Sequence, residues 1–246
     1  SSLTRLTSLT LRKVTMSVEC SRSLYSSIKS CIHLESLDLD DISLHDGVID
    51  LSSLTELTSL TLGDVTMSVE CNRSLCSSIK SCIHLERLDL IGITLHDGVI
   101  DLSSLTKLTS LTLFFVTMSV ECSRSLCSSI KSCIHLKRLH LHGITLHDGV
   151  IDLSSLTRLT SLTLRKVTMS VECSRSLCSS IKSCIHLESL DLYGITLHDG
   201  VIDLSSFSNL KELIFENVTM SPQCTQTLQT SLKQCQKLNF VIFKIY

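Results

Sequence analysis

The sequence has no tryptophan, a single proline and no marked excess of either charge. It holds 22 Lys+Arg against 24 Asp+Glu, a formal net charge of −2, with the two signs interspersed. Nucleic-acid binding is disfavoured, because phosphate neutralisation needs a basic patch or stripe. No apolar run approaches the ~18 residues of a transmembrane helix, and 43% hydrophobic residues are too many for a disordered chain. We therefore expect no nucleic-acid partner and no membrane insertion.

Internal repetition dominates the chain. The segment Ser-Ser-Leu-Thr recurs at Ser1, Ser52, Ser103 and Ser154, and the variant Ser-Ser-Phe-Ser begins at Ser205. The chain thus divides into four units of 51 residues, starting at 1, 52, 103 and 154, and a divergent unit at 205–246. We expect one domain over residues 1–246, built by stacking these units so that they share a continuous core.

Each unit carries two copies of one apolar pattern, Leu-x-x-Leu-x-Leu-x-x-Val/Ile-x-Leu/Met, at residues 6–16 and 34–44 in the first unit. The Leu-x-Leu step has period two, so it predicts a short strand with both leucines on the core side and the residues between them on the opposite face. Because 28 residues separate Leu6 from Leu34 but only 23 separate Leu34 from Leu57, one return is long and the next is short.

The long return predicts a helix over residues 17–32. Ser17 is the expected N-cap, and Pro222 takes the first helical position of the last unit, where its missing N–H costs nothing. The expected buried stripe of the first helix consists of Cys20, Leu24, Ile28, Cys31 and Ile32. The short return, residues 45–51, contains an Asp-Gly turn signal and predicts a turn with up to one 3₁₀ or helical turn.

Ten copies of this pattern in register resemble the leucine-rich repeat. The 28-residue copies are similar to the ribonuclease-inhibitor type, which also occurs in the carboxy-terminal sensing region of cytoplasmic NOD-like receptors. The ninth position departs from that type, because Val14 and Ile42 replace the usual Asn or Cys. The resemblance implies an α/β fold: a leucine-rich repeat solenoid, or horseshoe, with a concave parallel β-sheet and alternating helical and short returns on the convex side.

Thirteen cysteines recur at fixed helix positions. Cys20 and Cys31 would lie about 16 Å apart along a helix, whereas a disulfide needs Cα atoms within ~7 Å. We therefore expect reduced, buried thiols and a cytoplasmic location. Two glycosylation sequons, Asn72-Arg-Ser and Asn217-Val-Thr, favour the alternative, an extracellular location.

Repeated histidines do not predict a metal site. His33 and His45 recur once per unit, about 10 Å apart along the sheet, so they cannot converge on one ion. His140 and His142 share one strand and could hold an adventitious metal, but we favour contact with a partner. With no nucleophile elbow and no phosphate-binding glycine pattern, we expect neither enzymatic activity nor a cofactor.

The four complete units differ at only eleven of their 51 positions, and eight of these lie in or beside the strands, opposite the core leucines. Passive drift of exposed positions is the alternative, but it does not explain why exposed Arg22, Ser26 and Lys29 of the helix stay constant. Variation confined to the concave face favours a recognition surface.

Phe114 and Phe115 are the expected anchor of this surface, since aromatic and arginine side chains dominate protein-binding hot spots. The alternative is that both rings pack only on neighbouring strand residues. The predicted ligand-binding residues of the concave face are Arg87, Ile91, Phe114, Phe115, Arg138, His140, His142, Arg165, Lys166, Asp191 and Tyr193.

The sequence therefore predicts a non-enzymatic domain that binds a protein or microbial ligand on its concave face, as the recognition region of a larger receptor of the innate-immune type. The alternatives are an extracellular leucine-rich repeat binding module and a constitutive inhibitor or scaffold. The apolar end, residues 239–246, would form an open sheet edge, which favours self-association or a missing cap.

Overall fold

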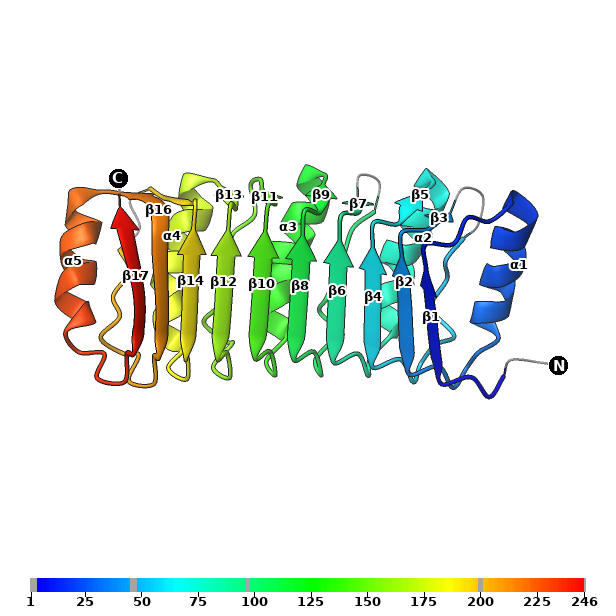
Figure 1. Ribbon diagram of the computed structural model, residues 1–246, viewed down its shortest axis with the longest axis horizontal. Helices are drawn as coiled ribbons and strands as arrows, with labels where there is room; N and C mark the ends of the chain where they lie inside the picture. Colours follow the sequence, from blue (N-terminus) through cyan, green and yellow to red (C-terminus); the bar gives the residue numbers. More distant parts are fainter. Residues whose placement is uncertain (1–3, 45–47, 96–97, 199–200, 246) are drawn as a thin grey trace.

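A computed structural model describes residues 4–44, 48–95, 98–198 and 201–245. Ten strands lie side by side in one parallel sheet, and the helices cover its opposite face (Figure 1). The ten strands are β1 Ser8–Arg12, β2 Ser36–Asp40, β4 Ser59–Gly63, β6 Arg87–Ile91, β8 Ser110–Phe114, β10 Arg138–His142, β12 Ser161–Arg165, β14 Ser189–Tyr193, β16 Glu212–Met220 and β17 Phe240–Ile245. This arrangement confirms the expected α/β solenoid.

Short two-residue strands follow the long ones and form a second ladder of parallel pairs, of which β15 pairs with the end of β16. These strands are β3 Ser43–Leu44, β5 Thr66–Met67, β7 Thr94–Leu95, β9 Thr117–Met118, β11 Thr145–Leu146, β13 Thr168–Met169 and β15 Thr196–Leu197. Each continues the chain from a long strand into its return.

The long returns are helical, as expected. The helices are α1 Val18–Lys29, α2 Val69–Ser78, α3 Val120–Ser129, α4 Val171–Ser180 and α5 Pro222–Leu232. Each begins after a serine N-cap whose hydroxyl accepts a hydrogen bond from the backbone N–H three residues later, as Ser17 does from Cys20. Pro222 occupies the first helical position of α5.

The helices end earlier than the apolar stripe predicted. α1 stops at Lys29, and α2, α3 and α4 pass into 3₁₀ turns over Ile79–Ser81, Ile130–Ser132 and Ile181–Ser183. The backbone turns before Ile32, so this side chain points away from the core and is 49% exposed. The prediction of Ile32 on the buried stripe was wrong, whereas Ile28 is buried.

The short returns contain no helix or 3₁₀ turn within their described residues, contrary to one form of the prediction. Residues 48–51 and 98–102 form neither helix, strand nor turn. The Asp46-Gly47 turn signal and His45 lie outside the described residues. An irregular return carries backbone groups into the interior without satisfying them within the segment, so neighbouring units must supply partners.

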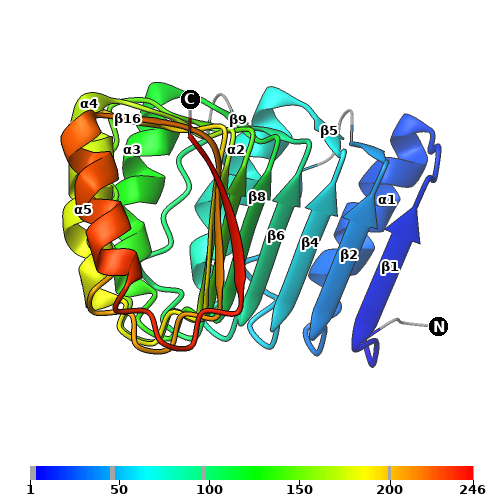
Figure 2. The same cartoon turned by 60° about the vertical axis from the view of Figure 1, so that its left-hand side comes forward.

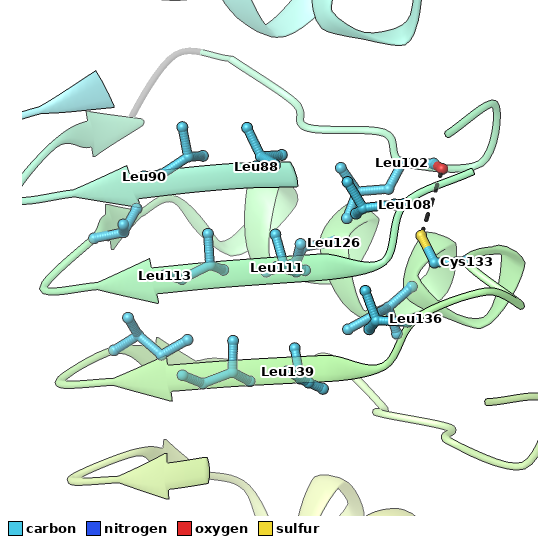
Figure 3. Packing of buried hydrophobic residues seen from close by; sticks show 14 of the residues in the cluster. Leu88, Leu90, Leu102, Leu108, Leu111, Leu113, Leu126, Cys133, Leu136 and Leu139 are labelled. Carbon is cyan, nitrogen blue, oxygen red and sulfur yellow. Dashed lines mark hydrogen bonds between the residues drawn. The ribbon is translucent and has the colours of Figure 1, made fainter. Parts of the chain in front are cut away.

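The leucine ladders fill the space between the sheet and the returns. Leu88 and Leu90 of β6, Leu111 and Leu113 of β8 and Leu139 of β10 all point to the same side (Figure 3), and each is at most 1% exposed. Aligned strands place each leucine beside its equivalent in the next strand. The core is therefore continuous from unit to unit.

A buried serine and a buried cysteine tie each short return to the following helical segment. The N–H of Leu102 donates to Ser129 Oγ at 3.1 Å. Its carbonyl accepts from Cys133 Sγ at 3.9 Å, the hydrogen bond drawn in Figure 3. The same pair of contacts recurs at Leu51, Leu153 and Leu204. We call this arrangement the return clamp. It gives the recurrent cysteines a structural role in the interior.

Both ends of the sheet are open among the described residues. β1 and β17 form the two lateral edges (Figures 1 and 2), and Phe240 and Val241 of β17 are each 47% exposed. Twelve cysteines are buried, but Cys20 of the first helix is exposed. The expectation that every thiol is buried therefore fails at α1, which has no helix packed on its outer side (Figure 1).

Candidate functional site: the concave face

Three residues of each strand point away from the leucine core and build the concave face in rows. In β10 these are Arg138 in the lower row, His140 in the middle row and His142 in the upper row. Strand register aligns them with Ser110, Thr112 and Phe114 of β8 on one side and with Ser161, Thr163 and Arg165 of β12 on the other. A fourth row, the turn row, follows the upper row and includes Phe115 and Gly143.

The predicted ligand-binding residues all belong to these four rows. The lower row holds Arg87 and Arg138, the middle row His140 and Asp191, the upper row Ile91, Phe114, His142, Arg165 and Tyr193, and the turn row Phe115 and Lys166. The strands of the third unit lie at the centre of the sheet (Figure 1), so the aromatic residues occupy the middle of the face.

Four rings of the third unit pack together, and we call them the aromatic cluster: Phe114, Phe115, His140 and His142. The Phe114 ring meets Phe115 edge to face, with centroids 4.7 Å apart, and lies 4.5 Å from His142. Phe114 is half-buried, whereas Phe115 stays 51% exposed. The rings pack on each other and still present an apolar surface, so their role as an anchor for a partner stays a prediction.

Phe115 adopts a backbone conformation that suits glycine. Its φ is +51°, in the left-handed region where a side chain costs about 1–2 kcal/mol. Its ring rests against Gly143, since a Cβ there would lie 2.4 Å from two ring carbons. A glycine at 143 is therefore required for the ring to take this position, and the strain is offset by contacts with its neighbours.

Three arginines of the concave face are neutralised by aspartates. Arg12 contacts Asp38 at 2.6 Å, Arg87 contacts Asp89 at 2.5 Å and Arg165 contacts Asp191 at 2.6 Å. Asp89 and Asp191 are buried at 3% and 6% exposure, so these pairs are partly desolvated.

Two of the predicted contact residues, Arg165 and Asp191, are therefore already engaged with each other. Arg165 also lies over the Tyr193 ring at 5.9 Å. This network holds the side chains of Arg165, Asp191 and Tyr193 in place beside the aromatic cluster. It also leaves Arg165 and Asp191 with fewer hydrogen-bonding groups for a ligand.

The two histidines of β10 are held neutral. Burial lowers the pKa of His140, and neighbouring His142 and Arg165 lower it further. Burial also lowers the pKa of His142, together with Lys166 and Arg165. Both rings therefore act as aromatic, uncharged groups at neutral pH, and the positive charge of the third unit comes from its lysine and arginine residues.

Sequence reasoning missed three cations at the lower edge of the sheet. Lys107, Lys137 and Arg158 precede β8, β10 and β12, and all three are exposed. The signal was present in the comparison of units, because Lys137 replaces Glu35, Glu86 and Glu188 at one of the eleven variable positions.

Metal binding, membrane insertion and glycosylation were the other properties considered from the sequence. Within the described ranges, no three His, Cys, Asp or Glu residues are grouped to hold a metal ion. Over the same ranges, no helix has the length and apolar character to cross a membrane. Asn72 of the first sequon is 5% exposed and its amide nitrogen donates to the Thr94 carbonyl, whereas Asn217 of the second is exposed.

These features define a leucine-rich repeat solenoid. No protein-family model and no curated protein matches the chain. Among solved structures, internalin C2 from Listeria monocytogenes is similar over 99% of this chain and 82% of its own, with 17% identity and a TM-score of 0.56.

Two further structures share the fold. The leucine-rich repeat protein LIC12759 of Leptospira interrogans is 16% identical over 89% of this chain and 62% of its own, with a TM-score of 0.50. A plant ice-binding protein is 18% identical over 87% of this chain and 65% of its own, with a TM-score of 0.52. At these identities the likeness is one of fold.

Proposed function

We propose that this chain is a ligand-recognition domain that binds a protein through its concave face, with the aromatic cluster as the contact centre. The supporting observation is the cluster itself: four near-identical units keep the same scaffold, and only the third carries aromatic rings in the upper and turn rows of its long-copy strand. Leucine-rich repeat solenoids provide extended concave surfaces of this kind. No catalytic role is needed to explain these residues.

The finer proposal is that the domain belongs to a larger receptor of the innate-immune type, acting in the cytoplasm. Its support is the sequence resemblance to sensing regions and the twelve buried thiols, among them Cys133, whose pKa burial raises to about 12. An extracellular module and a constitutive inhibitor are the competing roles.

The compartment is tested by the intact mass of protein from its native source. A cytoplasmic domain carries no glycan, whereas an extracellular one has an exposed acceptor only at Asn217 among the two sequons. A glycan at Asn217, removed by the Asn217→Gln variant, would refute the cytoplasmic proposal.

The binding role is tested by resetting the anchor to residues that sibling units already use. Phe114→Arg with Phe115→Lys reproduces Arg165 and Lys166 of the fourth unit, so the fold should be retained. Quantitative pull-down from native extract, followed by binding measurements on the purified partner, should show a protein bound by the wild-type chain and lost by this variant.

The matched control is Arg73→Ser on the exposed side of α2, which should bind as the wild type does. If the anchor variant keeps the same partners with the same affinity, the aromatic cluster is not the contact centre. If it unfolds, the rings have a packing role alone.

A further inference from the structure

The third unit differs from the second in the residue that faces its lower-row arginine. In β6 the lower-row arginine, Arg87, pairs with the middle-row aspartate two residues on. β10 has the same lower-row arginine, Arg138, but its middle-row residue is His140. His140 cannot accept an ion pair, so the change from Asp to His both removes a negative charge and releases an arginine.

Neither Lys137 nor Arg138 has a side-chain ion pair or hydrogen bond with any residue that the structure describes, and both are exposed. Lys107 and Arg158 contact ring nitrogens of His84 and His135, at 2.8 Å each, and not carboxylates. Four cations therefore gather at the lower end of β8, β10 and β12, and none of them forms an ion pair with a carboxylate of the described residues.

This positive patch and the aromatic cluster lie on the same strands. The cluster occupies the upper end of β8 and β10, and the four cations occupy the lower end. A five-residue strand spans about 17 Å. The surface is thus bipolar along the strand direction, apolar at one end and cationic at the other.

Acidic residues confine this surface on both sides. Glu35, Glu56 and Glu86 line the lower edge toward β1, with Lys107 at the boundary. Toward β16, Glu188 borders Lys137 and Arg158. A long polyanion such as nucleic acid would cross these carboxylates, and the whole chain carries a net charge of −2. The patch matches a short anionic segment only.

We propose that the third unit binds an acidic segment of a partner protein that also carries a large apolar or aromatic residue. The segment lies extended along β8 and β10, with its apolar residue on the aromatic cluster and its carboxylates on Arg138 and Lys137. Arginine binds carboxylates in a bidentate manner, and neighbouring apolar contact excludes water from such pairs. This inference rests on the proposed concave-face function and specifies the chemistry of its partner.

The chain supplies the decisive substitutions. His140→Asp restores the residue found at Asp38, Asp89 and Asp191, and it should pair with Arg138 as Asp89 pairs with Arg87. His140→Thr introduces the residue of the flanking middle-row positions, Thr112 and Thr163, and leaves Arg138 unpaired. The two variants thus separate the loss of the histidine ring from the neutralisation of the arginine.

The probe is a phage-displayed library of short random peptides selected on the wild-type chain, with fluorescence anisotropy on synthetic versions of the enriched sequences. We expect enriched peptides to be acidic and to contain Phe, Tyr, Trp or Leu. Their affinity should fall by about tenfold or more with His140→Asp and by less with His140→Thr. It should also weaken as NaCl rises from ~50 to ~300 mM.

A control of equal charge lies on the helix side. Arg73→Ser with Ser77→Asp on α2 changes the net charge by the same amount as Arg138→Ser with His140→Asp. The helix-side variant should bind acidic peptides as the wild type does. Equal losses for the two double variants would mean that net charge alone governs binding, which overturns the proposal.

The remaining outcomes separate this inference from the proposed function. Enriched peptides that are neutral or basic but lose binding when Phe114 and Phe115 are reset would overturn the acidic-segment inference and leave the concave face as the binding surface. Enriched peptides whose affinity is the same for the wild type and for every concave-face variant would overturn both the acidic-segment inference and the proposed function. Displacement of the acidic peptides by single-stranded DNA or by phosphatidylserine vesicles at equal charge concentration would assign the patch to those polyanions instead.

Discussion

The return clamp can be tested by removing one hydroxyl. Ser129 is 5% exposed, and its Oγ is the acceptor for the N–H of Leu102, which is itself fully buried. Ser129→Ala leaves that N–H without a partner, which costs about 1–3 kcal/mol. Alanine forms helix more readily than serine, a gain of up to about 0.5 kcal/mol at the end of α3. The net expectation is a loss of about 0.5–2.5 kcal/mol.

The matched control is the neighbouring Ser128→Ala. The Ser128 hydroxyl is exposed and donates to the Ser125 carbonyl, so its removal buries no unpaired group. The midpoint of urea unfolding, monitored by circular dichroism, should move to a lower urea concentration for Ser129→Ala but not for Ser128→Ala. Stacked repeats can lose two-state behaviour, so a local probe is also needed.

Amide hydrogen exchange provides that local probe. The Leu102 amide should be strongly protected in the wild type and should exchange faster in Ser129→Ala, while amides within β8 change less. If Ser129→Ala and Ser128→Ala have equal midpoints and the Leu102 amide keeps its protection, the clamp does not hold the return in place.

Two further predictions concern single side chains. Maleimide should label one thiol of the native chain quickly, because Cys20 is exposed while the other twelve thiols are buried. The Cys20→Ser variant should lose this fast phase. Fast labelling of several thiols would contradict the core packing. Lys166→Gly should stabilise the chain by about 0.5–1 kcal/mol, since φ is +50° at this residue and relief of about 1–2 kcal/mol exceeds the greater freedom of glycine in the unfolded state. Lys166→Ala keeps the Cβ and should leave the melting temperature unchanged, and equal effects of the two variants would refute the strain argument.

The strands and helix starts were predictable because they depend on local pattern. Leu-x-Leu alternation placed the strands, and serine N-caps placed the first residue of each helix. The helix ends were not predictable from the stripe, because Ile32 continues the apolar period after the backbone has already turned. An apolar residue on a convex surface has the same periodicity as one in the core, so pattern alone cannot distinguish them.

The candidate site was predictable in position but not in charge state. Comparison of the units located the variable residues on the concave face, including His140 and Arg138. It could not show that Asp191 is buried against Arg165, since the two lie 26 residues apart in sequence. Pairing across strands depends on register, which decides which cations remain available to a ligand.

The near-identity of the units makes the differences at the third unit interpretable. Backbone, core and return clamps are shared, so the change from Asp to His at position 140 acts on an unchanged scaffold, and its main physical effect is the loss of a partner for Arg138. The turn-row backbone is left-handed at Lys13, Asp64, Phe115 and Lys166 alike, so the strain is shared and the third unit differs in placing an exposed aromatic ring there. An exposed ring and an exposed arginine without an ion pair add little to folding stability. Their coincidence on two adjacent strands is therefore better explained by ligand binding than by stability.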